Sequence, residues 1–255
     1  MPRPWPLIAP VLAACALAGC GGDDEKGQGQ KTGGERDAAT STGAQTTTGA
    51  TTTARSPEAR CRKVPAPKPK PRQRLPAPTV RLDPEMTWRA LVRTSCGEFT
   101  ITLDVERAPR TASSFAHLAR RGFFDGLTFH RVINAFVIQG GDPQGNGMGG
   151  PGYKVVEPPP KNLRYTRGIV AMAKTEIEEP GTSGSQFYVV TGPDAQLPAE
   201  YALAGRVTQG QEVVDAIDVI PTNQTSPDPE QRDRPVDPVV IEKVTITGTK
   251  AEQDD

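Results

Sequence analysis

Residues 129–142 read FHRVINAFVIQGGD, and this stretch decides how the chain is interpreted. Short apolar runs at 127–132 and 136–139 are typical of β-strands. The few residues between the two runs predict a hairpin, which would place Gln139 across from Arg131. A cation and an amide are therefore expected side by side on neighbouring strands, with apolar residues around them.

Strands dominate the chain from about Thr87 onward. Polar and apolar residues alternate over 87–93 and again over 98–105, and Gly97 lies in the turn between these predicted strands. Many strands and few helices in about 160 residues indicate one closed β-barrel or sandwich. The other predicted elements are strands at 168–173, 186–191 and 239–247, helices at 109–122 and 212–220, and a polar, Pro-rich loop at 221–238.

The composition describes a neutral chain that is unusually rich in Gly and Pro. Its 255 residues include 30 basic and 30 acidic side chains, which excludes a strongly basic nucleic-acid-binding protein, so no nucleic-acid partner is expected. Hydrophobic residues make up 35%, against about 45–50% in globular chains when Gly is counted with them. With 26 Gly and 26 Pro, these two types supply about a fifth of the chain, against about 12% on average. The composition predicts a folded domain joined to a flexible segment.

The first residues, MPRPWPLIAPVLAACALAGC, have the features of a secretory signal. Arg3 supplies a positive start, and the apolar run 7–18 is too short for a membrane-spanning helix, which needs about 20 residues. The end of the run, 17–20, resembles a bacterial lipobox, in which the Cys becomes the lipidated amino terminus. This resemblance implies a signal peptide over 1–19 and a membrane lipid anchor on Cys20, facing outside the cytoplasm. Ordinary signal cleavage beside an incidental Cys is the alternative.

Residues 20–85 are predicted to form a disordered linker before a domain at 86–250, which a short tail at 251–255 follows. The segment 21–53 is too polar to bury the apolar surface that would offset the entropy cost of ordering. Residues 57–78 alternate Pro with basic residues, which favours an extended chain. We interpret the linker as a spacer that holds the domain away from a membrane.

Four cysteines are present, and two of them, Cys61 and Cys96, remain after removal of the signal and lipidation of Cys20. In an oxidising compartment such a pair can form a disulfide. Closing that loop would stabilise the fold by about 3–4 kcal/mol in the chain-entropy model. Two separate thiols are the alternative.

Several blocks of sequence point to one protein family. Residues 129–142 closely resemble the cyclophilin signature, and the resemblance extends over roughly 91–247. It implies an all-β fold, a closed eight-stranded antiparallel barrel capped by two helices, and peptidyl-prolyl cis–trans isomerase activity without a cofactor or metal. The further blocks that match in the same order are Met172-Ala173, Gly184-Ser185-Gln186-Phe187-Tyr188, Leu197 and Ala204-Gly205-Arg206-Val207.

The residues of the signature suit this reaction. Rotation about a peptide bond faces a barrier of about 18–20 kcal/mol because the amide is resonant, and X–Pro bonds exchange over tens to hundreds of seconds. In the twisted transition state the prolyl nitrogen carries a localised lone pair, and a fixed donor there lowers the barrier. We expect Arg131 to be that donor, Gln139 to orient it, and Phe136 to contact the proline ring. These three are the predicted catalytic residues.

The resemblance also implies a larger set of substrate-binding residues. Ala173 and Lys174 would supply a strand edge for the substrate backbone, and His130 is expected to be a hydrogen-bonding residue near the site. The full set comprises His130, Val137, Gly147, Ala173, Lys174, Thr175, Gln186, Tyr188, Gln196, Leu197 and Tyr201.

Several features depart from the best-known eukaryotic members of the family. Val137, Tyr188 and Tyr201 stand where those members have Met, Phe and His. Gln196 replaces the Trp before the pocket Leu, which argues against tight cyclosporin binding. Lys174 replaces an Asn, and residues 175–181 run a few positions longer than the archetype. These departures predict a reshaped pocket and a shifted substrate preference.

Together these features predict an exported, lipid-anchored isomerase that acts as a monomer on proline-containing polypeptides folding outside the cytoplasm. Two alternatives remain: a catalytically weak module that binds proline-containing peptides, and a structural surface lipoprotein whose barrel is only a scaffold. The prediction depends on Arg131, whose guanidinium must point into a concave surface and must not form an ion pair directed into the protein.

Overall fold

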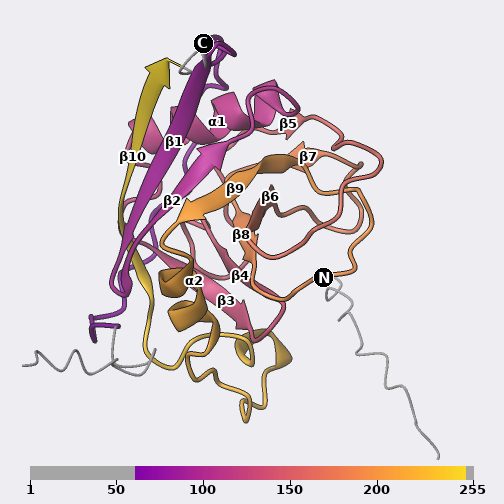
Figure 1. Cartoon of the computed structure of the whole chain (residues 1–255). Helices are drawn as coiled ribbons and strands as arrows, with labels where there is room; N and C mark the ends of the chain where they lie inside the picture. The colour runs from indigo at the N-terminus through magenta and orange to yellow at the C-terminus, as the bar shows by residue number, and fades with distance from the viewer. Residues whose placement is uncertain (1–60, 251–255) are drawn as a thin grey trace, which may run out of the picture. The chain divides into compact units, whose positions relative to one another are not determined.

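The computed structural model describes residues 61–250, which form a closed barrel of eight strands (Figure 1). Neighbouring strands run antiparallel in the order β1-β10-β3-β4-β8-β6-β9-β2, and the last of these pairs with the first. The predicted closed eight-stranded antiparallel barrel is therefore confirmed. Its strands are β1 (Met86–Thr94), β2 (Gly97–Leu103), β3 (Leu127–Ile133), β4 (Val137–Gly140), β6 (Ile169–Met172), β8 (Phe187–Val190), β9 (Leu203–Gln209) and β10 (Val240–Lys250).

Two helices accompany the barrel, as predicted: α1 (Pro109–Arg120) and α2 (Gln211–Asp218). Pro109 begins α1, where its missing N–H costs no hydrogen bond. Gly210 precedes α2 with a φ of 74°, and a Cβ there would lie 2.3 Å from the carbonyl oxygen of Glu98. Within the described part of the chain, α1 packs against β9 and β10, and α2 packs against β2 and β4.

Four elements lie outside the sequence-based prediction: β9 (Leu203–Gln209), the two strands of a small sheet, and a 3₁₀ turn. β9 contains Ala204 and Gly205, small residues with low strand propensity. A Cβ on Gly205 would lie 2.1 Å from the carbonyl oxygen of Thr102, so close approach to β2 requires Gly at this position. The other three are β5 (Val155–Val156) and β7 (Thr182–Ser183), which form a two-stranded sheet, and a 3₁₀ turn at Pro229–Gln231.

Aromatic side chains form the centre of the core. Phe115 from α1 stacks on Phe124 with 4.9 Å between ring centroids. Phe187 from β8 meets Phe124 edge-on at 5.7 Å and Phe129 of β3 at 5.9 Å. All four rings are at most 1% exposed. Such pairs each add about 0.5–1.5 kcal/mol beyond the burial of their area, so they fix β3 relative to β8.

Residues 61–85, which the sequence analysis places in a disordered linker, lie along the barrel instead, and we call this segment the strap. The backbone N–H of Lys70 donates to the carbonyl oxygen of Pro143 at 2.7 Å, and that of Leu75 donates to Pro151 at 2.8 Å. Prolines restrict φ along the segment, which favours an extended chain. The linker prediction therefore does not hold for this part of the chain.

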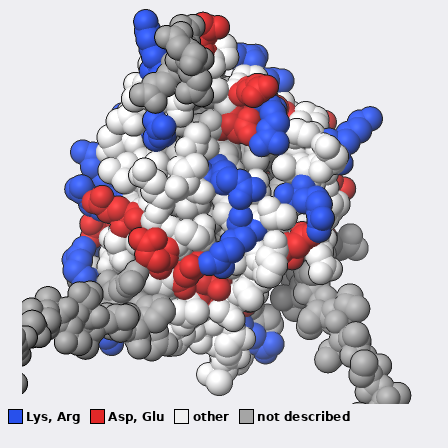
Figure 2. Space-filling model, viewed as in Figure 1, with Lys and Arg blue, Asp and Glu red and all other residues white. Residues whose placement is uncertain are grey.

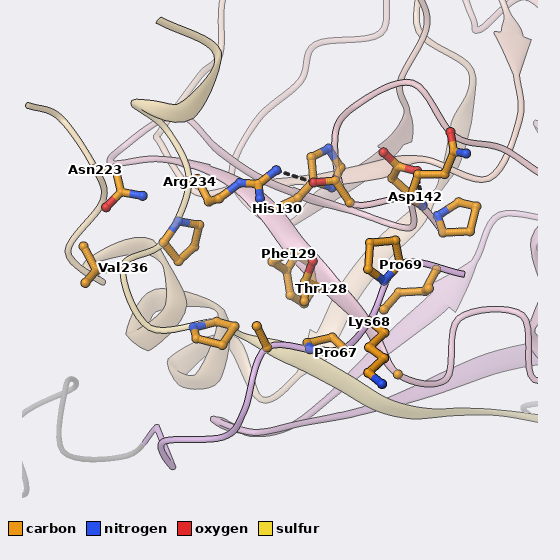
Figure 3. Close-up of a pocket in the computed structure, with 18 residues that line it drawn as sticks. Pro67, Lys68, Pro69, Thr128, Phe129, His130, Asp142, Asn223, Arg234 and Val236 are labelled. Atoms are coloured by element: carbon orange, nitrogen blue, oxygen red, sulfur yellow. Dashed lines mark hydrogen bonds between the residues drawn. The ribbon is translucent and has the colours of Figure 1, made fainter. Parts of the chain in front are cut away.

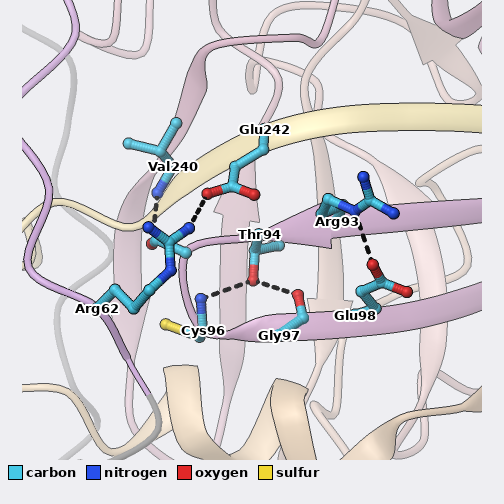
Figure 4. A network of polar contacts seen from close by, with 9 residues as sticks. Arg62, Arg93, Thr94, Cys96, Gly97, Glu98, Val240 and Glu242 are labelled. Atoms are coloured by element: carbon cyan, nitrogen blue, oxygen red, sulfur yellow. Dashed lines mark hydrogen bonds and ion pairs between the residues drawn. The ribbon is translucent and has the colours of Figure 1, made fainter.

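The strap begins at a disulfide between Cys61 and Cys96, the pair that the cysteine count favours. Cys96 lies in the turn between β1 and β2 and is buried. Arg62 forms an ion pair with Glu242 on β10 (Figure 4), and its backbone N–H donates to the carbonyl oxygen of Ser95 at 2.8 Å. One end of the strap is thus joined to the β1–β2 hairpin by a covalent bond and by polar contacts.

Acidic and basic side chains are interspersed on the face shown in Figure 2. This mixture agrees with the net charge of zero and creates no large field of one sign on that face. Among the helices within residues 61–250, none is long and apolar enough to cross a membrane.

Candidate active site

A bulge in β3 directs Arg131 away from the barrel core. Phe129 pairs with Gly140 and Arg131 pairs with Gln139, so His130 is an extra residue without a counterpart on β4. Side chains alternate along a regular strand, and a bulge shifts that alternation by one residue. Phe129 is therefore 1% exposed, whereas 34% of the Arg131 side chain remains exposed.

Arg131 begins a chain of hydrogen bonds that crosses neighbouring strands. Its Nη1 donates to Gln139 Oε1 at 3.3 Å, and Gln139 Nε2 donates to Gln186 Oε1 at 3.1 Å. Gln186 Nε2 donates in turn to the carbonyl oxygens of Gly147 at 2.8 Å and Gly149 at 3.0 Å. The predicted contact between Gln139 and Arg131 is present, and it fixes one edge of the guanidinium.

The series of hydrogen bonds that starts at Arg131 ends at the loop formed by residues 142–149. The buried Asp142 carboxylate accepts the backbone N–H groups of Gln144 at 2.8 Å, Asn146 at 2.9 Å and Gly147 at 2.5 Å. Hydrogen bonds to a charged acceptor are stronger than those between neutral groups, so this carboxylate holds the loop in one conformation. Gly147 has a φ of 83°, and no atom lies within 4 Å of the position that a Cβ would occupy, which leaves open space there.

An apolar cluster lies next to these hydrogen-bonded side chains. Gln139 on β4 pairs with Tyr188 on β8, which belongs to the cluster. The cluster contains the predicted pocket residues. Val137 and Tyr188 are buried, whereas Phe136 and Leu197 are half-buried. A proline ring can therefore reach Phe136 and Leu197, while Val137 and Tyr188 support the cluster from within.

The turn between β3 and β4 fixes the backbone before Phe136. Ala135 has a φ of 55°, a left-handed conformation that costs about 1–2 kcal/mol for a residue with a side chain. Asp218, the last residue of α2, holds this turn: its carboxylate accepts the Ala135 N–H at 3.0 Å and the Asn134 side-chain amide at 3.2 Å. The position of Phe136 therefore depends on α2.

The Tyr188 hydroxyl is buried and has no hydrogen-bond partner within residues 61–250. Burial raises the pKa of this phenol well above its ordinary value. We expect Tyr188→Phe to raise the free energy of unfolding by about 1 kcal/mol, because an unpaired hydroxyl no longer has to be desolvated.

Urea unfolding measures this change, and Tyr165→Phe is its matched control. The Tyr165 hydroxyl donates to the carbonyl oxygen of Tyr201 at 2.6 Å, so its removal is expected to lower the free energy of unfolding. Equal losses in the two variants would contradict the assignment of Tyr188 as unpaired.

Lys174 is nearly buried, with 5% of its side chain exposed. Its Nζ donates to the carbonyl oxygens of Thr175 at 3.3 Å and Glu178 at 3.2 Å, and it lies 3.4 Å from the Glu200 carboxylate. The ammonium also lies 5.6 Å from the centroid of the Tyr201 ring. Lys174 therefore ties the longer loop that follows it to the apolar cluster.

The structure brings most of the predicted site residues together, with three differences. The Ala173 N–H already donates to the carbonyl oxygen of Gln186 at 2.9 Å, so this N–H is not available to a substrate backbone. Gln196 is exposed, and its backbone N–H, rather than its side chain, bonds to Asp194 at 2.9 Å. The third difference concerns His130.

His130 lines a separate surface pocket of about 250 Å³, to which Arg131 does not contribute (Figure 3). Strap residues 66–69, the segment 142–145 and residues 234–236 also line it. Both ring nitrogens of His130 are buried without a hydrogen-bond partner among the described residues. The structure therefore does not bring His130 to the surface that carries Arg131.

The neutral ring of His130 predicts acid sensitivity of the fold. Burial lowers the pKa of His130 to about 4. The nearby Asp142 carboxylate acts in the opposite direction, and the Arg234 and Arg131 guanidinium groups lower the pKa as burial does. Between the ordinary value near 6.5 and about 4, the unfolded chain binds a proton that the folded chain does not. This contribution to stability is therefore complete above pH 6.5 and falls as the pH falls.

We expect His130→Gln to reduce the loss of unfolding free energy between pH 6.5 and pH 5 by about 2 kcal/mol. Urea unfolding of both proteins at the two pH values gives the difference, in which the common contribution of other groups cancels. Parallel pH profiles for the two proteins would rule out a neutral, buried His130.

Three carboxylates outside the predicted set hold the site in place: Asp142, Asp218 and Asp233. Asp233 Oδ2 lies 3.2 Å from Arg131 Nε, and 34% of each side chain is exposed. The ion pair thus lies at the surface and is not directed into the core, whereas a concave surface around Arg131 stays a prediction. Asp233 is 102 residues from Arg131 in sequence, and no local pattern indicates the contact.

Comparisons with known proteins agree with this geometry. The family model described as Cyclophilin type peptidyl-prolyl cis-trans isomerase/CLD matches residues 89–246. "Peptidyl-prolyl cis-trans isomerase B" of Streptomyces anulatus is 39% identical over 175 residues, which cover 62% of this chain and 95% of the relative. Human "Peptidyl-prolyl cis-trans isomerase-like 1" is 40% identical over 161 residues, which cover 62% of this chain and 91% of the relative.

A solved structure gives the same result. It is a cyclophilin type peptidyl-prolyl cis-trans isomerase of Cryptosporidium parvum in the presence of the dipeptide Ala-Pro. Its TM-score is 0.56 at 29% sequence identity, and the match covers 63% of this chain and 99% of that one. The chain therefore belongs to the cyclophilin-type peptidyl-prolyl cis–trans isomerase family.

Proposed function

We propose that this isomerase accelerates X–Pro rotation by donating a hydrogen bond from Arg131 to the prolyl nitrogen of the twisted amide. The lone pair on that nitrogen is delocalised in the planar ground state and localised in the transition state, so the donor stabilises the transition state more. Phe136 and Leu197 contact the proline ring and exclude water, which strengthens the contact with the cation. No bond of the substrate forms or breaks, so no nucleophile or base is needed.

The observation that carries the proposal is a guanidinium held by Gln139, a residue that pairs with Tyr188 of the apolar cluster. Nη1 of Arg131 donates to Gln139 and Nε donates to Asp233, and Nη2 has no hydrogen-bond partner within residues 61–250. A donor that is already oriented loses little entropy when the transition state forms. The proposed substrates are proline-containing polypeptides, in line with the Ala-Pro dipeptide used with the solved relative.

Exchange NMR on a short peptide that contains Ala-Pro tests this function. Catalytic amounts of the purified protein are expected to increase the intensity of cis–trans exchange peaks. Changed line shapes without faster exchange would favour the alternative of a proline-peptide binding module. Spectra that do not respond to the protein would favour a scaffold.

We further propose that the protein is exported and anchored by lipid on Cys20, and that its clients fold outside the cytoplasm. The lipobox-like residues 17–20 and the apolar run before them support this. The disulfide between Cys61 and Cys96 supports it as well, because disulfides persist mainly in oxidising compartments. The signal at 1–19 and Cys20 lie outside the described residues.

Intact mass spectrometry of protein from the membrane fraction tests the anchor. The expected species starts at Cys20 and carries lipid, and Cys20→Ser is expected to release the protein from the membrane. An unlipidated amino terminus at another residue would exclude the anchor and leave the isomerase activity untouched.

We also propose a monomer, since a closed barrel has no free strand edge for pairing. Light scattering on the detergent-free Cys20→Ser protein tests the oligomeric state.

A further inference from the structure

The guanidinium of Arg131 is held on two edges by residues from different parts of the chain. Gln139, on the neighbouring strand, accepts from Nη1 at 3.3 Å, and Asp233 Oδ2 lies 3.2 Å from Nε. Asp233 belongs to the Pro-rich loop at 221–238, which connects α2 to β10. This loop therefore supplies a counter-charge to the proposed donor.

The path of β3 explains why Asp233 reaches Arg131. β10 pairs with β3 only at the start of β3, through Thr128 and Leu127. Beyond that point the Val132 N–H donates to the carbonyl oxygen of Asp233 at 2.7 Å. The loop thus lies along the part of β3 that β10 does not pair with, and it places Asp233 beside the bulge.

Contacts other than the Asp233 side chain hold the loop in this position. Arg234 Nη2 donates to the carbonyl oxygen of Gly145, which Figure 3 shows as a dashed line. The Asn223 N–H donates to the carbonyl oxygen of Arg234 at 3.0 Å. Removing the Asp233 carboxylate should therefore leave the backbone of the loop in place.

We propose that Asp233 is a positioning residue that fixes the guanidinium of Arg131 for the reaction. The inference rests on the role proposed for Arg131 above. An ion pair at this exposure adds little to stability, but an Arg side chain has many rotamers, and losing one fixed edge makes the donor mobile. Mobility of a transition-state donor lowers the rate more than it weakens binding of the planar substrate.

The experiment compares the full-length protein with Asp233→Ala and Asp233→Asn in the Ala-Pro exchange assay. Asp233→Ala is expected to lower the catalysed rate by roughly three- to tenfold, with peptide Kd changed by less than about twofold. Asp233→Asn is expected to lie between Asp233→Ala and the unmodified protein, because an amide oxygen still accepts from Nε.

Asp237→Ala is the matched control. Asp237 lies in the same loop, and its carboxylate pairs with Lys63 Nζ of the strap at 3.1 Å, away from Arg131. Its rate should equal that of the unmodified protein. The Nε–Hε cross-peak of Arg131 in a ¹H–¹⁵N spectrum should shift in Asp233→Ala and not in Asp237→Ala, which reports the contact independently of catalysis.

Adding Asp233→Ala to Arg131→Ala separates the two proposals. If Asp233 acts through Arg131, the double variant is expected to have the same rate as Arg131→Ala alone. A rate for Asp233→Ala within twofold of the unmodified protein, or above it, would overturn the positioning role even where Arg131→Ala is slow. If Arg131→Ala itself has the rate of the unmodified protein, the proposed function of Arg131 is wrong, and the positioning role of Asp233 is wrong with it.

Discussion

Replacing Arg131 with alanine is expected to lower the catalysed rate of Ala-Pro exchange by about 100- to 1,000-fold, the range seen when one donor to transition-state charge is removed. The Gln139 amide and the Asp233 carboxylate hold the guanidinium, and Gln139 pairs with Tyr188 of the apolar cluster. Binding of the peptide should weaken far less, because the planar ground state gives the donor little to stabilise.

Two further variants sharpen this test. Arg131→Lys keeps the charge but lacks the planar fork that meets both Gln139 and Asp233, so it is expected to recover only part of the rate. Arg89→Ala is the control: Arg89 lies on β1 and bonds to Thr249, away from β3 and β4. A rate for Arg131→Ala within a few-fold of the unmodified protein would exclude the proposed mechanism.

Reducing the disulfide between Cys61 and Cys96 is expected to lower the free energy of unfolding by about 3–4 kcal/mol. The two cysteines are 35 residues apart, and a bridge across such a loop limits the conformations of the unfolded chain. The folded state should survive, because the strap keeps its hydrogen bonds to Pro143 and Pro151. Urea unfolding with and without reductant measures the difference.

The variant Cys61→Ala/Cys96→Ala is the control for reduction. Its unfolding midpoint should match that of the reduced protein and should not respond to reductant. If the oxidised and reduced proteins unfold at the same urea concentration, the bridge does not constrain the unfolded chain.

The parts of the site that follow from local spacing could be predicted from the sequence. A hairpin pairs residues in register, so the contact of Arg131 with Gln139 follows from two strand patterns and a short turn. The buried pocket residues follow in the same way, since Val137 and Tyr188 belong to apolar runs. Many short strands with few helices indicated a β-barrel or a sandwich, and the family resemblance implied the closed eight-stranded barrel that is observed.

Features that depend on distant segments could not be predicted. The bulge at His130 breaks the alternation that strand patterns assume, so the sequence alone does not show that Phe129 and Arg131 point in different directions. Asp218 and Asp233 reach the site from loops and helix ends far along the chain. The strap looks like a linker because it has few apolar residues, and its order comes from backbone partners on the barrel and from the disulfide at Cys61.

The position of that disulfide also determines how the domain responds to mechanical force. The strap and β1 both lie between Cys61 and Cys96, so tension applied from the amino-terminal side crosses the sulfur–sulfur bond directly to the start of β2. Residues 62–95 form a covalent loop that bears no tension, and pulling on the chain cannot peel them from the barrel. Once the bond is cut, the same pull acts on the isolated hydrogen bonds of the strap, which detach one after another.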